Sequence, residues 1–198
     1  MTAPDVQLTL CPISKAMSTV AMNIFCYLYD PINFMKHGQS ISSTIWSGRL
    51  CRKINELKSY DELQQSIGNK FYRTIAVVRD PLSRFISGYL DKCVRPKRKC
   101  FGCDSEDVFC VLTRLKMALI NKPEIPSATN ITFSVELLHM APQTWYCEMR
   151  KVFESLIFVK YGQTGYEHER MIKELAIAFT IARVPSTQVN YIENELKS

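Results

Sequence analysis

The chain has 198 residues, of which 46% are hydrophobic and 22% charged, and its formal net charge is +6. These values are typical of one folded globular domain with a sizeable core, and they exclude a disordered chain. The moderate positive charge favours an anionic partner, which could be nucleic acid, a phosphorylated small molecule or an acidic glycan.

One alternating stretch and two apolar runs predict three strands, and stretches with helical spacing alternate with them along the chain. The expected strands span residues 7–13, 74–78 and 156–161. The expected helices span residues 18–29, 59–67, 106–121 and 167–182, and a further helix follows Asp80. Ser59 and Glu62 have the spacing of a capping box. This alternation favours an α/β layered fold with a mostly parallel sheet, in which ligands bind at the carboxyl ends of the strands.

The stretch CPISKAMSTV, residues 11–20, places Lys15 in a short loop between the first strand and the following helix. The first amides of a helix lack internal partners and lie at the positive end of its dipole, so this arrangement suits an anion. Lys15 adds a positive charge, and Ser18 and Thr19 add hydroxyl donors. The loop has no glycine and does not match GxxxxGK[ST]. The alternative is a core helix capped by Ser18 and preceded by an unrelated lysine.

The stretch RDPLSRFISGY, residues 79–89, follows the second strand. Asp80 can cap the helix, which leaves Arg79 at the end of the strand and Ser87 two turns into the helix. An arginine fork with a hydroxyl is a good receptor for a phosphate, and Arg84 lies one turn before Ser87. In the alternative interpretation, the Ser87 hydroxyl bonds back to the Ser83 carbonyl and Arg84 is a solvated surface residue.

Together these stretches resemble two sulfotransferase motifs. CPISKAMST resembles the 5′-phosphosulfate loop, and RDPLSRFISGY fills every fixed position of the 3′-phosphate pattern RDPxxRxxSxY. Downstream, HMAPQTWYC and LIFVKYG resemble the H-x-x-PQ-x-W-x-C segment and the following strand of carbohydrate sulfotransferases. The resemblance, from about Leu10 to Leu196, is to Golgi enzymes of the chondroitin 4-O-sulfotransferase type and their divergent invertebrate relatives. It implies a P-loop-like three-layer fold, with a central mostly parallel sheet flanked by helices.

The resemblance implies that the donor is 3′-phosphoadenosine-5′-phosphosulfate (PAPS) and that no metal is required. Lys15, Ser18 and Thr19 would hold the 5′-phosphosulfate, and Arg79 and Ser87 would hold the 3′-phosphate. Lys15 would also neutralise the bridging oxygen during sulfuryl transfer. The implied acceptor is a carbohydrate hydroxyl, with an acidic glycan favoured over nucleic acid.

Sulfuryl transfer also needs a base for the acceptor proton. Of the three histidines, His139 lies in the segment that resembles the substrate-side motif and is the candidate; alternatively it only forms a hydrogen bond in a buried loop. For Trp145 there are two interpretations: it lines a cleft for the acceptor, or it is an aromatic anchor in the packing of the fold.

Eight cysteines favour an oxidising compartment. Four of them, Cys93, Cys100, Cys103 and Cys110, are spaced symmetrically and could ligate zinc. The family resemblance and the glycosylation sequon at Asn130 favour paired disulfides instead. The basic cluster within this stretch either grips an acidic glycan or belongs to a solvated loop; it consists of Arg95, Lys97, Arg98 and Lys99.

The sequence shows neither a targeting signal nor an apolar stretch of about 20 residues that would span a membrane. The resemblance implies a location in the Golgi lumen or membrane. We therefore expect residues 1–198 to form a single sulfotransferase domain without the N-terminal membrane anchor and the C-terminal end of the family. Pro185 stands where relatives often have a histidine.

Two rival hypotheses are a non-catalytic relative that binds nucleotide or glycan, and a zinc-stapled module that binds nucleic acid. The presence of Lys15, Arg79 and Ser87 favours the enzyme over the non-catalytic relative.

Overall fold

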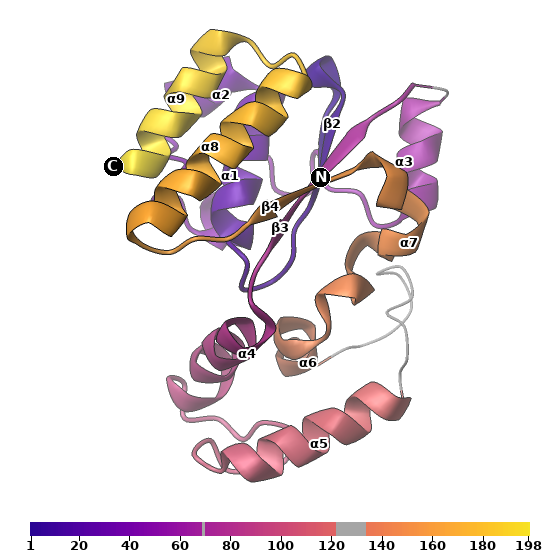
Figure 1. The fold of residues 1–198 in the computed structure, drawn as a ribbon, viewed down its shortest axis with the longest axis vertical. Coiled ribbons are helices and arrows are strands. Elements are labelled where there is room, and N and C mark those ends of the chain that lie inside the picture. Colours follow the sequence, from indigo (N-terminus) through magenta and orange to yellow (C-terminus); the bar gives the residue numbers. More distant parts are fainter. Residues whose placement is uncertain (69, 122–133) are drawn as a thin grey trace.

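A computed structural model describes residues 1–68, 70–121 and 134–198. Its centre is a four-stranded sheet in the order β1–β2–β3–β4 (Figure 1). The strands are β1 (Thr2–Ala3), β2 (Leu8–Cys11), β3 (Arg73–Val78) and β4 (Leu156–Lys160). The short β1 pairs antiparallel with β2, and the other two pairs are parallel. The three strands predicted from the sequence and the mostly parallel sheet are confirmed.

One face of the sheet carries the main hydrophobic core. Leu10 pairs with Ile75, and Ile75 with Ile157, so their side chains form a row across the sheet. Three helices pack against this face: α1 (Ser18–Tyr29), α8 (Gly165–Ile181) and α9 (Ser186–Lys197). Helices α8 and α9 lie next to each other on one side of the sheet (Figure 1). This core fixes the strands whose carboxyl ends carry the candidate site.

The opposite face of the sheet has a thinner cover. Small side chains such as Ala76 face Met149 and Tyr146 there. The cover is a 3₁₀ segment (Gln143–Glu148) followed by α7 (Met149–Val152), and a disulfide from Cys11 to Cys147 fastens it to β2. The sheet is thus flanked on both faces by helical segments, as expected.

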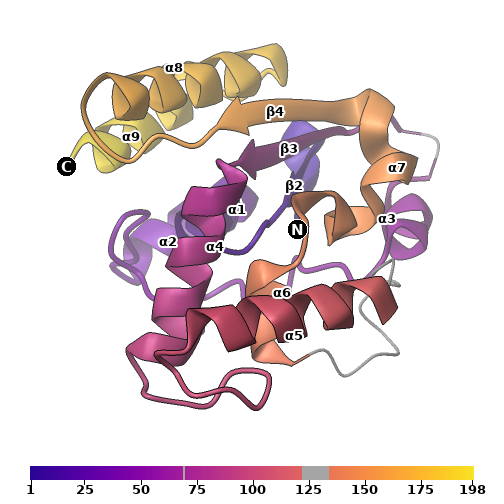
Figure 2. The same cartoon turned by 60° about the horizontal axis from the view of Figure 1, so that its bottom comes forward.

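A third group of helices lies beyond the carboxyl end of β3 (Figure 2). It comprises α4 (Pro81–Tyr89), a π turn (Leu90–Val94), α5 (Val108–Asn121) and α6 (Val135–Met140). These elements share a separate hydrophobic cluster that includes Val111 and Leu137. The group also holds the disulfides Cys93–Cys100 and Cys103–Cys110.

The remaining described elements lie between these groups in the sequence. They are α2 (Pro31–Lys36), α3 (Tyr60–Ile67) and the 3₁₀ turns Pro4–Val6, Trp46–Gly48 and Phe153–Ser155. The Ser59 hydroxyl caps α3 by accepting the Glu62 N–H, as predicted. The prediction that Ser18 caps α1 is wrong, because the cap position is Met17, whose backbone is left-handed and whose side chain forms no cap hydrogen bond.

All eight cysteines form disulfides, and the fourth bond joins Cys26 to Cys51. The paired-disulfide prediction is therefore confirmed, and the alternative four-cysteine zinc site is not formed. The sequon at Asn130 lies outside the described residues. In the described ranges, no helix is both long enough and apolar enough to cross a membrane.

Candidate functional site

The residues that the sequence motifs single out come together around one cavity. It has a volume of about 600 Å³ and lies where β2 and β3 end and the following helices begin. Its lining includes all six candidates: Lys15, Ser18, Thr19, Arg79, Ser87 and His139. Segments up to 124 residues apart, from Lys15 to His139, thus form a single site, in the crevice that α/β folds use for ligands.

The loop between β2 and α1 has a backbone suited to an anion. Lys15 and Met17 are both left-handed, with φ angles of 64° and 60°. Alternation of left-handed residues turns successive N–H groups towards one side. Among the described residues, the amides of Met17, Ser18 and Thr19 donate no backbone hydrogen bond, as expected for the start of a helix. The loop therefore presents unpaired donors beside the Lys15 ammonium group.

The turn between β3 and α4 fixes Arg79. Asp80 caps α4 by accepting the Ser83 N–H at 2.8 Å, as predicted. The Arg79 guanidinium donates to the Lys15 carbonyl at 3.1 Å and lies 4.8 Å from the centre of the Tyr161 ring. Arg79 thus bridges the residues that follow β2 and β4 while remaining in contact with the cavity.

Ser87 faces the same cavity from α4. In the described part of the chain its hydroxyl has no hydrogen-bond partner, so the local bond to the Ser83 carbonyl is not formed. Its donor is available to a ligand.

Arg84 has a structural role that neither interpretation of the sequence anticipated. It is only 3% exposed. Its guanidinium donates to the carbonyls of Ser14 and Ala141, at 2.9 and 2.7 Å, and to the Tyr146 hydroxyl at 3.2 Å. Both the phosphate-receptor and the solvated-surface interpretations are therefore wrong. Buried carbonyls need hydrogen-bond donors, and Arg84 supplies donors to Ser14 and Ala141. It thereby joins the Lys15 loop to the segment after α6.

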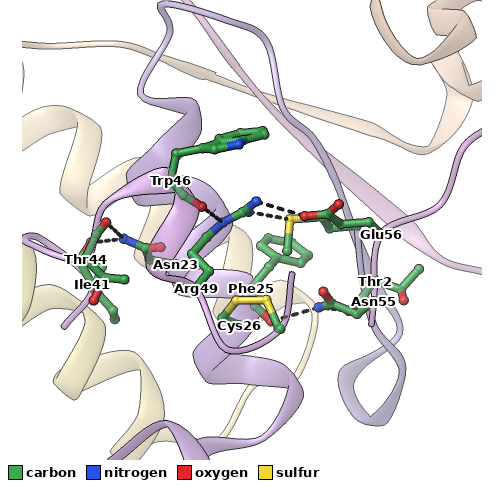
Figure 3. The surroundings of a disulfide bond; sticks show 12 residues. Thr2, Asn23, Phe25, Cys26, Ile41, Thr44, Trp46, Arg49, Asn55 and Glu56 are labelled. Carbon is green, nitrogen blue, oxygen red and sulfur yellow. Dashed lines mark hydrogen bonds and ion pairs between the residues drawn. A yellow bond between two sulfur atoms is a disulfide. The ribbon is translucent and has the colours of Figure 1, made fainter. Parts of the chain in front are cut away.

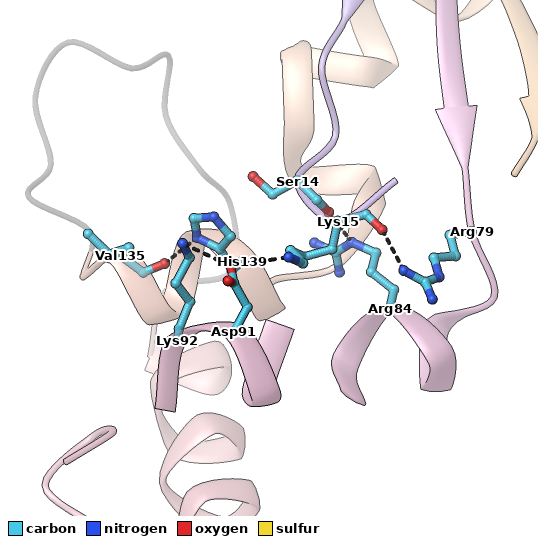
Figure 4. Close-up of polar contacts among 8 residues, drawn as sticks. All are labelled: Ser14, Lys15, Arg79, Arg84, Asp91, Lys92, Val135 and His139. Carbon is cyan, nitrogen blue, oxygen red and sulfur yellow. Dashed lines mark hydrogen bonds and ion pairs between the residues drawn. The ribbon is translucent and has the colours of Figure 1, made fainter. Parts of the chain in front are cut away.

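An ion-pair cluster lies at the side of the cavity (Figure 4). The Lys15 ammonium group is 3.1 Å from the carboxylate of Asp91, which also pairs with Lys92 at 2.9 Å. Partial burial alone would raise the pKa of Asp91, but hydrogen bonds from Lys92 and Lys15 outweigh it and lower this pKa below its ordinary value. The π turn after α4 brings Asp91 into place, and such turns often occur at functional sites.

His139 reaches the cavity from α6, close to this cluster (Figure 4). Its Nδ1 atom lies 2.7 Å from the Val135 carbonyl. Burial lowers the pKa of His139 below the ordinary histidine value; nearby Lys92 and Lys15 lower it further, against the Val135 hydrogen bond and Asp91. Gly88 lets α4 pack closely against α6, because a Cβ atom at this position would lie 2.9 Å from the His139 carbonyl oxygen. The lowered pKa favours the neutral imidazole near neutral pH.

Two further cavities adjoin the central one. The first, about 400 Å³, shares Arg79, Ser87 and Tyr161 with it and adds Arg95 and Gln163. The second, about 320 Å³, shares Trp46 and Leu138 with it and adds Trp145. The two adjoining cavities share different residues with the central cavity and none with each other, so the Arg79 end and the tryptophan end of the central cavity are distinct.

The surroundings of the other expected residues are also defined. Trp145 lines the second adjoining cavity, as its cleft interpretation requires. The basic cluster at residues 95–99 is exposed in the loop closed by Cys93–Cys100, and Arg95 contacts the first adjoining cavity.

The residues of the site that the sequence prediction missed include Trp46, Asp91, Gln143 and Tyr161. Tyr161 directly follows a strand, and Gln143 belongs to the quoted PQ pair, so position alone could have indicated both. Trp46 and Asp91 carried no such signal.

Known proteins resemble this chain along nearly all of its length. Residues 1–198 match the sulfotransferase family Sulfotransfer_2. The chain is 30% identical to carbohydrate sulfotransferase chst-1 of Caenorhabditis elegans, over 96% of this chain and 59% of that protein. It is 28% identical to putative sulfotransferase vep-2 of the same nematode, over 98% and 61%. The chain thus spans about three fifths of the length of these relatives. No solved structure shows a significant match.

Proposed function

This chain belongs to the sulfotransferase family, and we propose that it transfers a sulfuryl group from PAPS to a hydroxyl group of a carbohydrate. The observation that carries the proposal is the convergence of Lys15, Arg79, Ser87 and His139 on one cavity. A cation at the reaction centre, a receptor for a phosphate and a base are the three functions that this chemistry asks of a protein.

The chemistry of the cavity fits the two anionic ends of the proposed donor. Lys15 and the unpaired amides and hydroxyls at Ser18 and Thr19 suit the 5′-phosphosulfate. Arg79 and Ser87 offer a charged fork and a free hydroxyl to the 3′-phosphate. The adjoining cavity with Tyr161 and Gln163 leaves room at this end for the rest of the nucleotide.

PAPS supplies an activated sulfuryl group, and the remaining steps depend on residues of this chain. Lys15 stabilises negative charge on the bridging oxygen, for which its ammonium group must exchange its contact with Asp91 for one with the donor. A carbonyl only accepts hydrogen bonds, so the contact with Val135 requires the His139 proton to be on Nδ1. The Nε2 atom of the neutral ring then carries a lone pair and can take the proton from the hydroxyl group of the carbohydrate acceptor.

For the acceptor we propose a glycosaminoglycan or a glycoprotein glycan, with an acidic glycan favoured by the net charge of +6. The relative chst-1 is named a carbohydrate sulfotransferase, which supports a sugar as the acceptor class. We place the protein in the Golgi lumen. Four disulfides support an oxidising compartment of this kind.

The test is a transfer assay with radiolabelled PAPS and a panel of unsulfated glycans, using the full chain, Lys15→Ala, His139→Ala and the exposed control Lys36→Ala. We expect label in a glycan with the wild type and Lys36→Ala, and a loss of at least about 100-fold with the two cavity variants. Binding of nucleotide without transfer to any glycan would instead identify a non-catalytic relative.

A further inference from the structure

Trp46 lies at the junction between the candidate reaction site and the adjoining tryptophan-lined cavity. It lines both the central cavity, which contains Lys15 and His139, and the cavity that contains Trp145. Although it is a large aromatic residue, Trp46 is 49% exposed. Trp46 was not singled out by the sequence motifs. Neither the proposed binding of the donor nor the proposed role of His139 as the base gives it a function.

The indole of Trp46 is supported from one side (Figure 3). The Arg49 guanidinium lies 4.3 Å from the centre of its ring and also donates to the Trp46 carbonyl at 3.1 Å. Arg49 is only 4% exposed and pairs with Glu56 at 2.8 Å. Because the guanidinium covers one face of the indole, the exposed surface belongs to the other face and the edges.

The loop that carries Trp46 is anchored on both sides. Before it, the buried Asn23 side chain donates to the carbonyls of Ile41 and Thr44, at 3.0 and 2.8 Å. After it, the disulfide Cys26–Cys51 joins the loop to α1 (Figure 3). An exposed apolar side chain held this firmly loses little conformational entropy when a ligand binds.

We propose that Trp46 is the platform on which a sugar ring of the acceptor stacks, so that the acceptor enters from the tryptophan-lined cavity towards His139. The inference rests on the proposed function and specifies its acceptor side. One face of a pyranose ring carries axial C–H groups and is apolar, and a flat indole gives it a large dispersion contact. The guanidinium behind the ring holds the indole in place.

The order of the cavities favours a sugar over the adenosine of the donor as the occupant. The residues shared with the first adjoining cavity are the phosphate receptors Arg79 and Ser87, whereas Trp46 and Leu138 are shared with the second. A donor whose 3′-phosphate lies at Arg79 and Ser87 therefore has room for its adenosine in the first adjoining cavity, which Trp46 does not line. The space beside Trp46 remains continuous with the reaction site and is lined by a second tryptophan, Trp145.

The experiment uses calorimetry on the full chain in two steps. First, 3′,5′-adenosine bisphosphate is titrated into the wild type, Trp46→Ala, Trp46→Phe and Tyr166→Ala. Tyr166 is a matched control, because it is 77% exposed and lies on α8 outside the cavities described above. Second, hexasaccharides of unsulfated chondroitin, heparosan and poly-N-acetyllactosamine are titrated into each nucleotide-saturated protein. Thermal unfolding verifies that every variant is folded.

We expect nucleotide affinity to stay within about twofold in all four proteins, because in the described structure Trp46 forms no hydrogen bond or ring contact with Arg79 or Ser87. At least one glycan should bind with equal affinity to the wild type and to Tyr166→Ala. The same glycan should bind about 10-fold more weakly to Trp46→Ala and with intermediate affinity to Trp46→Phe. Equal glycan affinity in Trp46→Ala and Tyr166→Ala overturns the platform, as does a nucleotide-bound wild type that binds none of the three glycans. A wild type that binds no nucleotide refutes the proposed function itself, and the platform with it.

Discussion

Gln143 and Arg79 exchange two hydrogen bonds. The Arg79 N–H donates to Oε1 of Gln143 at 2.9 Å, and Nε2 of Gln143 donates to the Arg79 carbonyl at 2.7 Å. The glutamine amide thus pairs with the backbone of the arginine as a neighbouring strand would. The pair holds the carboxyl end of β3 against the segment that follows α6, and it fixes the backbone from which the guanidinium extends.

Gln143→Ala tests this positioning role. The variant leaves the Arg79 N–H and carbonyl without their partner, so we expect the free energy of unfolding to fall by about 1–3 kcal/mol. The affinity for 3′,5′-adenosine bisphosphate should fall at least about threefold, because Arg79 is no longer held. Urea denaturation and calorimetry measure the two effects. Thr144→Ala, at an exposed neighbouring position, is the control; equal nucleotide affinity in both variants would contradict the role.

Arg84→Lys tests the buried tie between the Lys15 loop and the segment after α6. A lysine cannot reach Ser14, Ala141 and Tyr146 at once, because it lacks the planar fork of arginine. We expect the variant to lose about 3 kcal/mol of unfolding free energy in urea denaturation. Arg98→Lys, at an exposed position, should stay within about 0.5 kcal/mol of the wild type. A similar small loss at Arg84 would show that this tie is dispensable.

Asp91→Asn tests the ion pair that holds Lys15 in the free protein. The carboxylate lines the cavity and competes with an anionic ligand for the Lys15 ammonium group. Its removal should therefore increase the affinity for 3′,5′-adenosine bisphosphate about fivefold at low salt, corresponding to roughly 1 kcal/mol. The gain should shrink as the salt concentration rises. The exposed Asp104→Asn is the control, and a decrease in affinity in Asp91→Asn alone would refute the competition.

The pH dependence of transfer tests His139 as the base. Since burial lowers its pKa, the imidazole stays neutral at neutral pH and becomes protonated only on the acid side of the ordinary histidine value. A protonated imidazole cannot accept a proton, so kcat should decrease as the pH falls through this lowered pKa.

His139→Gln should abolish that acid limb together with most of the rate. His37→Gln is a matched control, because His37 also bonds a carbonyl four residues earlier, at 3.0 Å, but lies exposed on the surface. An unchanged acid limb in His139→Gln would assign the proton transfer to another group.

The sequence could predict the strands and the two phosphate motifs because these are local patterns. The apolar run at residues 74–78 identifies β3, and Asp80 with Pro81 identifies the start of α4. The start of α1 was not predictable in the same way. The left-handed backbone at Lys15 and Met17 occurs without any glycine, so Ser18 became the apparent cap.

The remaining features depend on partners distant in the sequence. Arg84 is buried because the carbonyls of Ser14 and Ala141 converge on it, and these lie 70 and 57 residues away. Likewise Cys11 pairs with Cys147 across 136 residues. Cysteine spacing could not indicate that pairing, because only the folded chain brings these residues together.

In the proposed function, Arg79 and Ser87 bind the 3′-phosphate of the donor while the Lys15 loop binds its 5′-phosphosulfate. This binding mode is tested by calorimetric titration of 3′,5′-adenosine bisphosphate into the wild type and Arg79→Ala, with the exposed Arg114→Ala as control. We predict that the wild type and Arg114→Ala bind the nucleotide with equal affinity and that Arg79→Ala, although folded, loses binding by at least about 100-fold. A wild-type chain that binds no nucleotide, or an Arg79→Ala variant that binds it as well as the control, would refute this binding mode.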